Sequence, residues 1–166
     1  NTSSKTGEET GKTYRKVIGE HTGVEPVVLN HFVNISAMSY GALSFRAHAS
    51  LNKGAKMAGI LHNTGEGALA PCHEYGGGDL IFQIGTAKYG IRDDDGNLDD
   101  NLLRQMAEHP QVKMFEIKLA QGAKPGKGGM LLKEKITEEI AKIRKIPMGK
   151  DAYAPARHKE FSDVHG

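Results

Sequence analysis

Short apolar segments alternate with helical segments through most of the chain, and glycine-containing turns separate them. The segments that we expect to be strands are 27–29, 32–38, 60–62, 80–84 and 112–119. Helices are expected over 44–58, around 102–107 and around 137–143. Strands that alternate with helices in this way indicate an α/β fold built on a parallel sheet.

The ends of the predicted helices carry recognisable signals. Ser44 is a good N-cap for the first helix, and Asp99 or Asp100 stands near the start of the second. Pro110 and Pro147 end the second and third helices. On the first helix we expect one apolar face, made of residues about a turn apart: Ala47, Leu51, Ala55 and Ala58.

The composition is that of an ordinary globular protein and excludes several other classes. A chain of 166 residues with 38% hydrophobic residues is long enough for one domain with a core. A net charge of +2 gives no reason to expect nucleic-acid binding. No apolar run approaches the roughly 20 residues of a membrane span, and no signal peptide is visible. Cys72 is the only cysteine, which fits a reducing, cytoplasmic compartment.

The chain divides into a polar N-terminal arm, residues 1–31, and an α/β region, residues 32–166. In the α/β region, polar residues come directly after the predicted strands, and in an α/β barrel this face carries the active site. A complete barrel needs at least about 200 residues. We therefore expect only the N-terminal half of a (β/α)8 barrel, with strand edges left open.

Four motifs, taken together, resemble one known family. They are ISAMSYGALS at 35–44, HNTGEG at 62–67, GGDLIFQIGT at 77–86 and QVKMFEIKLAQGAKPGKGG at 111–129. They are similar to the FMN-binding synthase domain of the glutamate synthase family. The length of the 77–92 region and the segment IPMGKD at 146–151 look more like the stand-alone branch than the large multidomain synthase.

The resemblance implies a (β/α)8 barrel of the FMN-dependent type and an activity. The implied reaction is the reductive amination of 2-oxoglutarate to glutamate, with ammonia or another amine as the nitrogen source and an electron donor that the sequence does not name. The FMN phosphate would be held by later barrel loops, so the FMN site is incomplete in this chain. An iron–sulfur cluster is known in the large synthase, but its cysteines also come later.

The cofactor-facing residues are expected after the first and last predicted strands. By resemblance, the backbone of Ala37, Met38 and Ser39 lies along the flavin ring, unless it is a plain strand-to-helix turn. Lys118 ends the 112–119 strand, where a cation would stabilise negative charge on the flavin. The alternative is an ion pair between Lys118 and Glu116. Two glutamines complete the expected cofactor contacts: Gln83, which could instead contact the substrate, and Gln121.

The substrate-facing residues are expected in the glycine-rich turns. By resemblance, Lys124 binds a carboxylate of 2-oxoglutarate, and Gly67 lies at the substrate. Glu66 is the best acid–base candidate, because imine formation and reduction need proton transfers. The alternative is that Glu66 only caps backbone amides of its turn. Met130 stands where the large synthase has glutamine as a substrate ligand, and this departure weakens the assignment of 2-oxoglutarate.

No metal site is predicted. His62, Cys72 and His73 do not reach the four ligands of a structural zinc site, and the DDDG turn at 93–96 lacks the ligand alternation of a calcium loop. A second interpretation of the whole chain is a non-catalytic assembly or binding subunit. Such a subunit would complete its barrel with another copy or with a partner, and so bury the open strand edges.

Overall fold

The computed structural model describes residues 14–124, 126–161 and 163 of the chain. These residues belong to two compact units, which divide between Phe32 and Val33. In the first unit, β1 (Lys16–Ile18) and β2 (Val27–Leu29) form an antiparallel pair with Val17 opposite Val28. The strand at 27–29 is confirmed, whereas β1 lies in the polar arm and was not predicted from its sequence.

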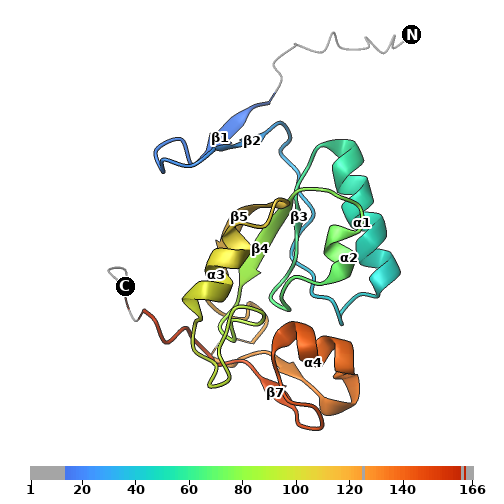
Figure 1. Cartoon of the computed structure of the whole chain (residues 1–166), viewed down its shortest axis with the longest axis vertical. Coiled ribbons are helices and arrows are strands. Elements are labelled where there is room, and N and C mark those ends of the chain that lie inside the picture. Colours follow the sequence, from blue (N-terminus) through green and yellow to red (C-terminus); the bar gives the residue numbers. More distant parts are fainter. Residues whose placement is uncertain (1–13, 125, 162, 164–166) are drawn as a thin grey trace, which may run out of the picture. The chain divides into compact units, whose positions relative to one another are not determined.

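The second unit is built on a parallel sheet of three strands in chain order (Figure 1). These are β3 (His62–Asn63), β4 (Leu80–Ile84) and β5 (Val112–Ile117). The predicted α/β class with a parallel sheet is confirmed, and the predicted bounds of β4 are correct. The described residues, 14–124, 126–161 and 163, form no closed barrel.

The strand expected at 32–38 is reduced to a single bridge between Ile35 and His62. Ile35 exchanges backbone hydrogen bonds with Leu61 and Asn63, at 2.9 and 3.0 Å. The side chain of Asn34 accepts from the Leu61 N–H at 2.8 Å, so this backbone donor is not available to a longer ladder. The prediction of a full strand was therefore wrong, although the segment does lie beside β3.

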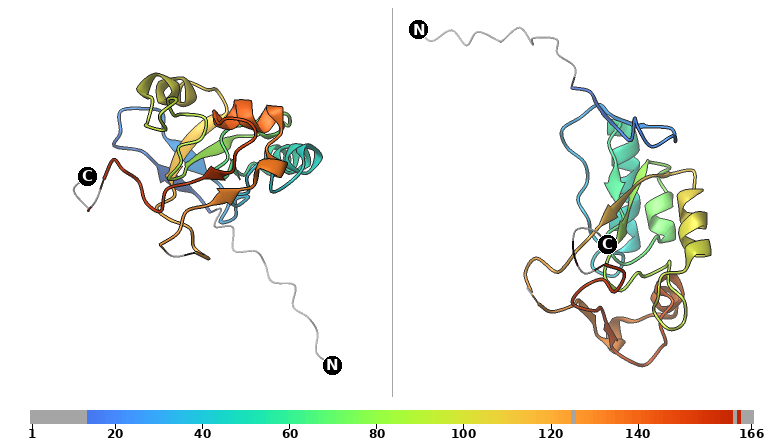
Figure 2. Two further views of the ribbon diagram at one scale, coloured as in Figure 1. Left: turned by 90° about the horizontal axis from the view of Figure 1, so that it is seen from below. Right: turned by 90° about the vertical axis from the view of Figure 1, so that its left-hand side faces the viewer.

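Helices cover one face of this sheet, as Figures 1 and 2 show. The helix α1 (Phe45–Ala58) begins at Ser44, whose hydroxyl accepts from the Ala47 N–H, and it ends at Gly59 in the left-handed conformation. The short α2 (Pro71–Glu74) packs on α1. The helix α3 (Asp100–Ala107) begins at Asp99, whose carboxylate accepts from two backbone N–H groups. The predicted N-terminal caps, Ser44 and Asp99, are confirmed.

The buried face of α1 differs from the predicted one. Ala55 is fully buried, but Ala58 is exposed, and Ala47 and Leu51 are only half-buried. The buried positions of this helix are His48, Ala49, Asn52 and Ala55. The polar His48 and Asn52 take core positions because Asn52 bonds the Gly78 backbone through both ends of its amide, and His48 contacts two other imidazole rings.

The main apolar core lies between the sheet and α3. Leu80, Phe82 and Val112 are buried there with Ile91, and three half-buried residues of α3 pack against them: Leu102, Leu103 and Met106. The acidic turn before α3 is closed by Asp93, which accepts from the backbone and side chain of Asn97. This local bonding agrees with the sequence interpretation of residues 92–100 as a turn.

After β5 the chain makes an excursion that returns beside the sheet. It contains β6 (Met130–Leu131), the 3-10 turn η1 (Lys133–Lys135), α4 (Glu138–Arg144) and β7 (Ala152–Tyr153). β6 and β7 pair antiparallel. The hydroxyl of Thr137 caps α4 by accepting from the Ile140 N–H at 3.2 Å. The α4 helix was predicted, but the β6–β7 pair was not, because each strand has only two residues.

No helix among the described residues is long and apolar enough to cross a membrane.

Candidate functional site

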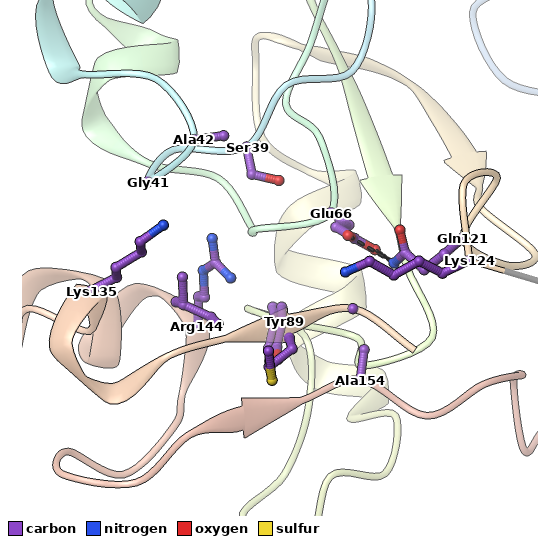
Figure 3. Close-up of a pocket in the computed structure, with 13 residues that line it drawn as sticks. Ser39, Gly41, Ala42, Glu66, Tyr89, Gln121, Lys124, Lys135, Arg144 and Ala154 are labelled. Atoms are coloured by element: carbon purple, nitrogen blue, oxygen red, sulfur yellow. Dashed lines mark hydrogen bonds between the residues drawn. The ribbon is translucent and has the colours of Figure 1, made fainter. Parts of the chain in front are cut away.

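A cavity of about 290 Å³ lies beside the carboxyl ends of the sheet strands (Figure 3). One wall is the turn from Ser39 to Ala42, which precedes α1. The opposite wall comes from the excursion after β5, and Figure 3 shows Lys135 and Arg144 extending from it toward that turn. Polar residues after the strands of an α/β sheet were expected to form the site, and three of the predicted residues besides Ser39 line this cavity or its rim: Glu66, Gln121 and Lys124.

Three of the predicted residues form a closed polar triad at one end of the cavity. The ammonium of Lys118 lies 3.2 Å from Glu66 Oε1 and donates to Gln121 Oε1 at 2.9 Å. The amide nitrogen of Gln121 donates to both oxygens of Glu66, at 2.9 and 2.8 Å. Gln121 therefore bridges the cation and the carboxylate, which are each about a quarter exposed.

The triad decides between alternatives that the sequence left open. Lys118 pairs with Glu66 rather than with Glu116. Glu66 receives its hydrogen bonds from side chains, and no backbone N–H among the described residues donates to its carboxylate. The interpretation of Glu66 as a cap of its own turn is therefore wrong. The carboxylate is held open to the cavity, where it can accept or donate a proton.

Arg144 supplies a buried cation on the opposite wall. It is 7% exposed, and its Nη2 donates to the backbone oxygen of Tyr40 at 3.0 Å. Its guanidinium carbon lies 5.2 Å from the ring centre of Tyr89. No carboxylate among the described residues lies within ion-pair distance of Arg144, and burial lowers its pKa. A buried guanidinium without a counter-ion favours an anionic ligand.

Two lysines add to the positive charge of the cavity. Lys124 and Lys135 both line it, and both are exposed. Figure 3 shows the Lys124 side chain running beside Glu66 and Gln121. Met130 also lines the cavity, with half of its surface exposed. The cavity thus combines three cations with one carboxylate and an apolar patch, which suits a small ligand with more than one negative charge.

The glycines of the HNTGEG motif allow close backbone approach. Gly65 has φ of +70°, and a Cβ there would lie 2.6 Å from the backbone of Met38 and Ser39. A Cβ at Gly67 would lie 2.9 Å from the Arg144 guanidinium. The predicted substrate residue Gly67 therefore lies against a cation of the cavity. Of the predicted backbone residues, Ser39 lines the cavity, whereas Ala37 and Met38 do not.

Gln83 lies outside the cavity lining and belongs to a second polar group. Its amide nitrogen donates to Glu116 Oε1. The amide of Asn63 donates to the same oxygen at 2.9 Å. Gln83 was expected at the flavin edge or at the substrate; its donor end is bonded to Glu116, and its oxygen has no donor among the described residues.

Comparison with known families decides the identity of the chain. The family model described as a conserved region in glutamate synthase matches residues 5–165. The chain belongs to the glutamate synthase family. The family predicted from the four motifs is thus confirmed, and it is a family of oxidoreductases.

Curated relatives support this membership at moderate identity. The glutamate synthase large subunit-like protein YerD of Bacillus subtilis is 44% identical over 149 residues, which are 89% of this chain and 28% of that protein. The archaeal-type glutamate synthase [NADPH] of Dehalococcoides mccartyi is 40% identical over 80% of the chain and 24% of its own length. The archaeal glutamate synthase [NADPH] of Archaeoglobus fulgidus is 42% identical over 78% and 23%. The chain spans less than a third of each relative.

This glutamate synthase-family chain also contains a buried histidine cluster, formed by His48, His62 and His73. All three are fully buried, and their ring centres lie 4.5–5.6 Å apart. Burial lowers the pKa of His62 to about 4 and that of His73 to about 3. Among the described residues, no group of three His, Cys, Asp or Glu side chains could hold a metal ion.

Several residues of the cavity and of the histidine cluster in this glutamate synthase-family chain were not predicted from the sequence. Arg144 follows Ile140 by four positions, so it falls on the buried face of α4, and this spacing could have revealed it. His48 could have been found in the same way, since it stands four before Asn52 and seven before Ala55. Nothing in the sequence separates Tyr89 and Lys135 from ordinary loop residues.

Proposed function

We propose that this chain is the cofactor- and substrate-facing part of an oxidoreductase that reductively aminates 2-oxoglutarate to glutamate with FMN. The observation that carries the proposal is the cavity itself, in which Lys124, Lys135 and Arg144 surround the single carboxylate of Glu66. A substrate with two carboxylates matches three cations. A carboxylate with a fixed orientation is the group that amine addition and imine protonation require.

The residues near the cavity also fit a flat cofactor with polar edges. Lys118 supplies a cation beside the carboxyl ends of β4 and β5, since its N–H bonds the Ile84 oxygen at 2.9 Å. The close approach at Gly65 brings the turn before Glu66 against the Met38–Ser39 backbone. FMN, when bound, would supply the hydride. The chain's own residues would hold the cofactor edge through Lys118, Gln83 and Gln121.

The proton steps follow from the triad. Ammonia would add to the keto carbon of 2-oxoglutarate, and loss of water would give an imine. Glu66 is placed to take a proton from the added amine and to return one to the imine nitrogen. Hydride and one proton then convert the imine to the amine of glutamate. Arg144 and Lys124 would orient the two carboxylates and keep the substrate fixed during these transfers.

The fold of the whole protein is part of the proposal. The parallel order of Ile35, β3, β4 and β5 supports a (β/α)8 barrel that the remainder of a longer protein completes. The FMN phosphate would be bound by that remainder. Any iron–sulfur cluster would also lie outside this chain, whose single cysteine, Cys72, is buried.

The test is to purify the full-length protein and assay it directly. We expect flavin absorbance near about 450 nm and glutamate formation from 2-oxoglutarate, ammonium and NADPH, the donor that the names of two relatives carry. Replacing ammonium by methylamine would show which amine is used. A folded, colourless protein would contradict the cofactor assignment, and a coloured protein inactive with every donor would contradict the reaction.

Variants of the cavity test the substrate. R144Q removes the buried cation, and we expect KM for 2-oxoglutarate to rise about 10- to 100-fold, because a charge-assisted hydrogen bond contributes about 1.5–3 kcal/mol. K127Q is the matched control, since Lys127 is exposed and lies outside the cavity. M130Q restores the amide of the large synthase and should lower the same KM. Unchanged KM in both R144Q and M130Q would exclude 2-oxoglutarate from this cavity.

A second candidate is the assembly role, which one observation favours. Ile117 and the following Leu119 are 56% and 64% exposed, and β5 pairs only with β4 among the described residues. An apolar strand edge of this kind invites a partner or a second copy. Sedimentation of the 166-residue chain tests this candidate, because a stable monomer would contradict it.

A further inference from the structure

Three polar side chains from neighbouring strands meet at one carboxylate oxygen on the face of the sheet opposite the helices. Asn63 on β3 donates through Nδ2 to Glu116 Oε1 on β5 at 2.9 Å, and Gln83 on β4 donates through Nε2 to the same oxygen. Asn63 and Gln83 are 3% and 7% exposed, whereas Glu116 is exposed, so two buried amides meet a carboxylate at the surface of this face. One carboxylate therefore ties together all three strands of the sheet.

The charge of Glu116 fixes the direction of both amides. An ionised carboxylate has only acceptors, so each amide must turn its NH2 group toward it. For Asn63, the opposite end is also assigned, because its Oδ1 accepts from the Gly65 N–H at 2.9 Å. For Gln83, the oxygen is left pointing away from Glu116, and no donor among the described residues bonds it. A neutral partner in place of Glu116 would permit either orientation.

The free oxygen of Gln83 lies on the same face as Lys118. Gln83 and Glu116 are paired across β4 and β5, and Lys118 follows Glu116 by two residues, so all three project to one side. Lys118 in turn reaches the cavity residue Glu66 at 3.2 Å. The oxygen of Gln83 and the ammonium of Lys118, which the proposed function places at the cofactor edge, therefore lie on one face of the sheet, two residues apart along the strand direction.

We propose that Glu116 is a positioning residue that makes Gln83 an obligate hydrogen-bond acceptor toward the bound cofactor. Its ligand is then an N–H group. The pyrimidine edge of a flavin has one N–H, at N3, between two carbonyl oxygens, so an acceptor in fixed orientation selects that N–H and sets the register of the ring. The proposal rests on the proposed function, since it names the contact that the flavin makes.

The same carboxylate also supports the turn before the acid–base residue. Asn63 connects Glu116 to the Gly65 N–H, and Glu66 follows directly. Loss of the charge at position 116 would therefore loosen both the cofactor edge and the turn. A purely structural carboxylate would affect stability alone, and this difference makes the proposal testable.

A charge exchange in the full-length protein provides the test. E116Q removes the charge, and the doubly substituted E116Q/Q83E moves it to position 83, where a carboxylate is again an acceptor bonded to an amide. We expect the Kd of FMN, measured by quenching of flavin fluorescence, to rise about tenfold in E116Q and to return to within about threefold of the wild type in E116Q/Q83E. E108Q is the control, because Glu108 is an exposed carboxylate at the end of α3.

The outcomes distinguish a failure of the proposed contact between Gln83 and the flavin from a failure of the proposed function. Wild-type affinity for FMN in E116Q would overturn the proposal, because Glu116 would then not orient Gln83 toward the flavin. Weaker binding in E116Q/Q83E than in E116Q would also overturn it, because a flavin carbonyl would then face position 83. Thermal unfolding of the flavin-free proteins gives a second readout, in which the exchange should restore the midpoint that E116Q lowers. If the wild type binds no flavin, the proposed function fails, and this unfolding cycle still decides whether Glu116 orients Gln83.

Discussion

Consecutive residues of β3 point to opposite faces of the sheet and enter two different polar clusters. His62 faces the helices and joins the histidine cluster, where both of its ring nitrogens lack a hydrogen-bond partner among the described residues. Asn63 faces the other way and uses both ends of its amide, toward Glu116 and Gly65. The histidine rings can be buried because they stay neutral, whereas the amides of Asn63 and Gln83 are bonded to the charged carboxylate of Glu116.

Burying a neutral imidazole and burying a fully bonded amide have different costs in folding free energy. A buried neutral imidazole loses its hydrogen bonds to water, and it cannot take up a proton without a larger penalty. A buried amide with all its bonds made loses little. The helix side of the sheet should therefore limit stability in acid, and the other side should be insensitive to pH over the same range.

Acid stability is the largest expected effect. Unfolded histidine binds a proton near pH 6.5, whereas burial keeps His62 neutral until its pKa of about 4 and His73 until its pKa of about 3. Protons therefore favour the unfolded chain as pH falls below 6.5. Between pH 6.5 and 5 we expect the free energy of unfolding to fall by about 3 kcal/mol for these two residues together. Urea unfolding at several pH values measures this, and a flat profile would contradict it.

Removing one ring should reduce that pH dependence. H62F keeps an aromatic ring in the cluster but cannot bind a proton, so the loss between pH 6.5 and 5 should shrink by about 1.5 kcal/mol. H21Q is the control, because His21 is exposed in the first unit. The same urea series decides the outcome. An unchanged slope in H62F would mean that His62 is already protonated in the folded protein.

The amide cluster should show the opposite behaviour. N63A removes the donor to Glu116 and leaves the Gly65 N–H without its acceptor. We expect a loss of about 1–2 kcal/mol in the free energy of unfolding, equal at pH 7 and at pH 5.5. Urea unfolding at the two pH values tests this. A loss that grows in acid would contradict this expectation and would break the contrast between the two faces of the sheet.

The triad at the cavity should give the smallest change in stability. Q121A leaves the partly exposed ion pair between Lys118 and Glu66 in place, so the free energy of unfolding should change by less than about 1 kcal/mol. In the proposed reaction of the full-length protein, glutamate formation should nevertheless fall at least about tenfold, because Glu66 loses the amide that orients it. Urea unfolding and the initial rate of the same variant check the two expectations. If the free energy of unfolding falls by more than about 1 kcal/mol together with the rate, Gln121 is a structural residue.

The sequence predicted the elements better than the surroundings of their side chains. Ser44, Asp99 and Thr137 carry capping chemistry that acts within three residues, so the starts of α1, α3 and α4 could be read locally. The strand at 80–84 is a continuous buried run between turn residues, and it too was found. β6 and β7 have two residues each and depend on pairing with one another, which no local pattern shows.

Only part of the candidate site could be predicted from the sequence, for a similar reason. Glu66, Lys118 and Gln121 stand in motifs after strands, and their meeting follows from the parallel order of β3, β4 and β5. Arg144 comes from a helix in the later excursion, and its position at the cavity depends on how that excursion returns. The partner of Lys118 was also not predicted: the sequence suggested Glu116, two residues away on the same strand, whereas Glu66 comes from the turn after β3 and meets Lys118 only in the fold.

The hydrogen bond from Arg144 to the Tyr40 oxygen joins residues 104 positions apart. A second bond, from the Tyr40 hydroxyl to Glu139 at 2.7 Å, spans 99 positions between the same two segments. Closing so long a loop has an entropic cost that local pairs avoid, so we expect such contacts to form late in folding. A partly folded chain with its sheet and first helices in place would then lack the wall of the cavity that carries Arg144.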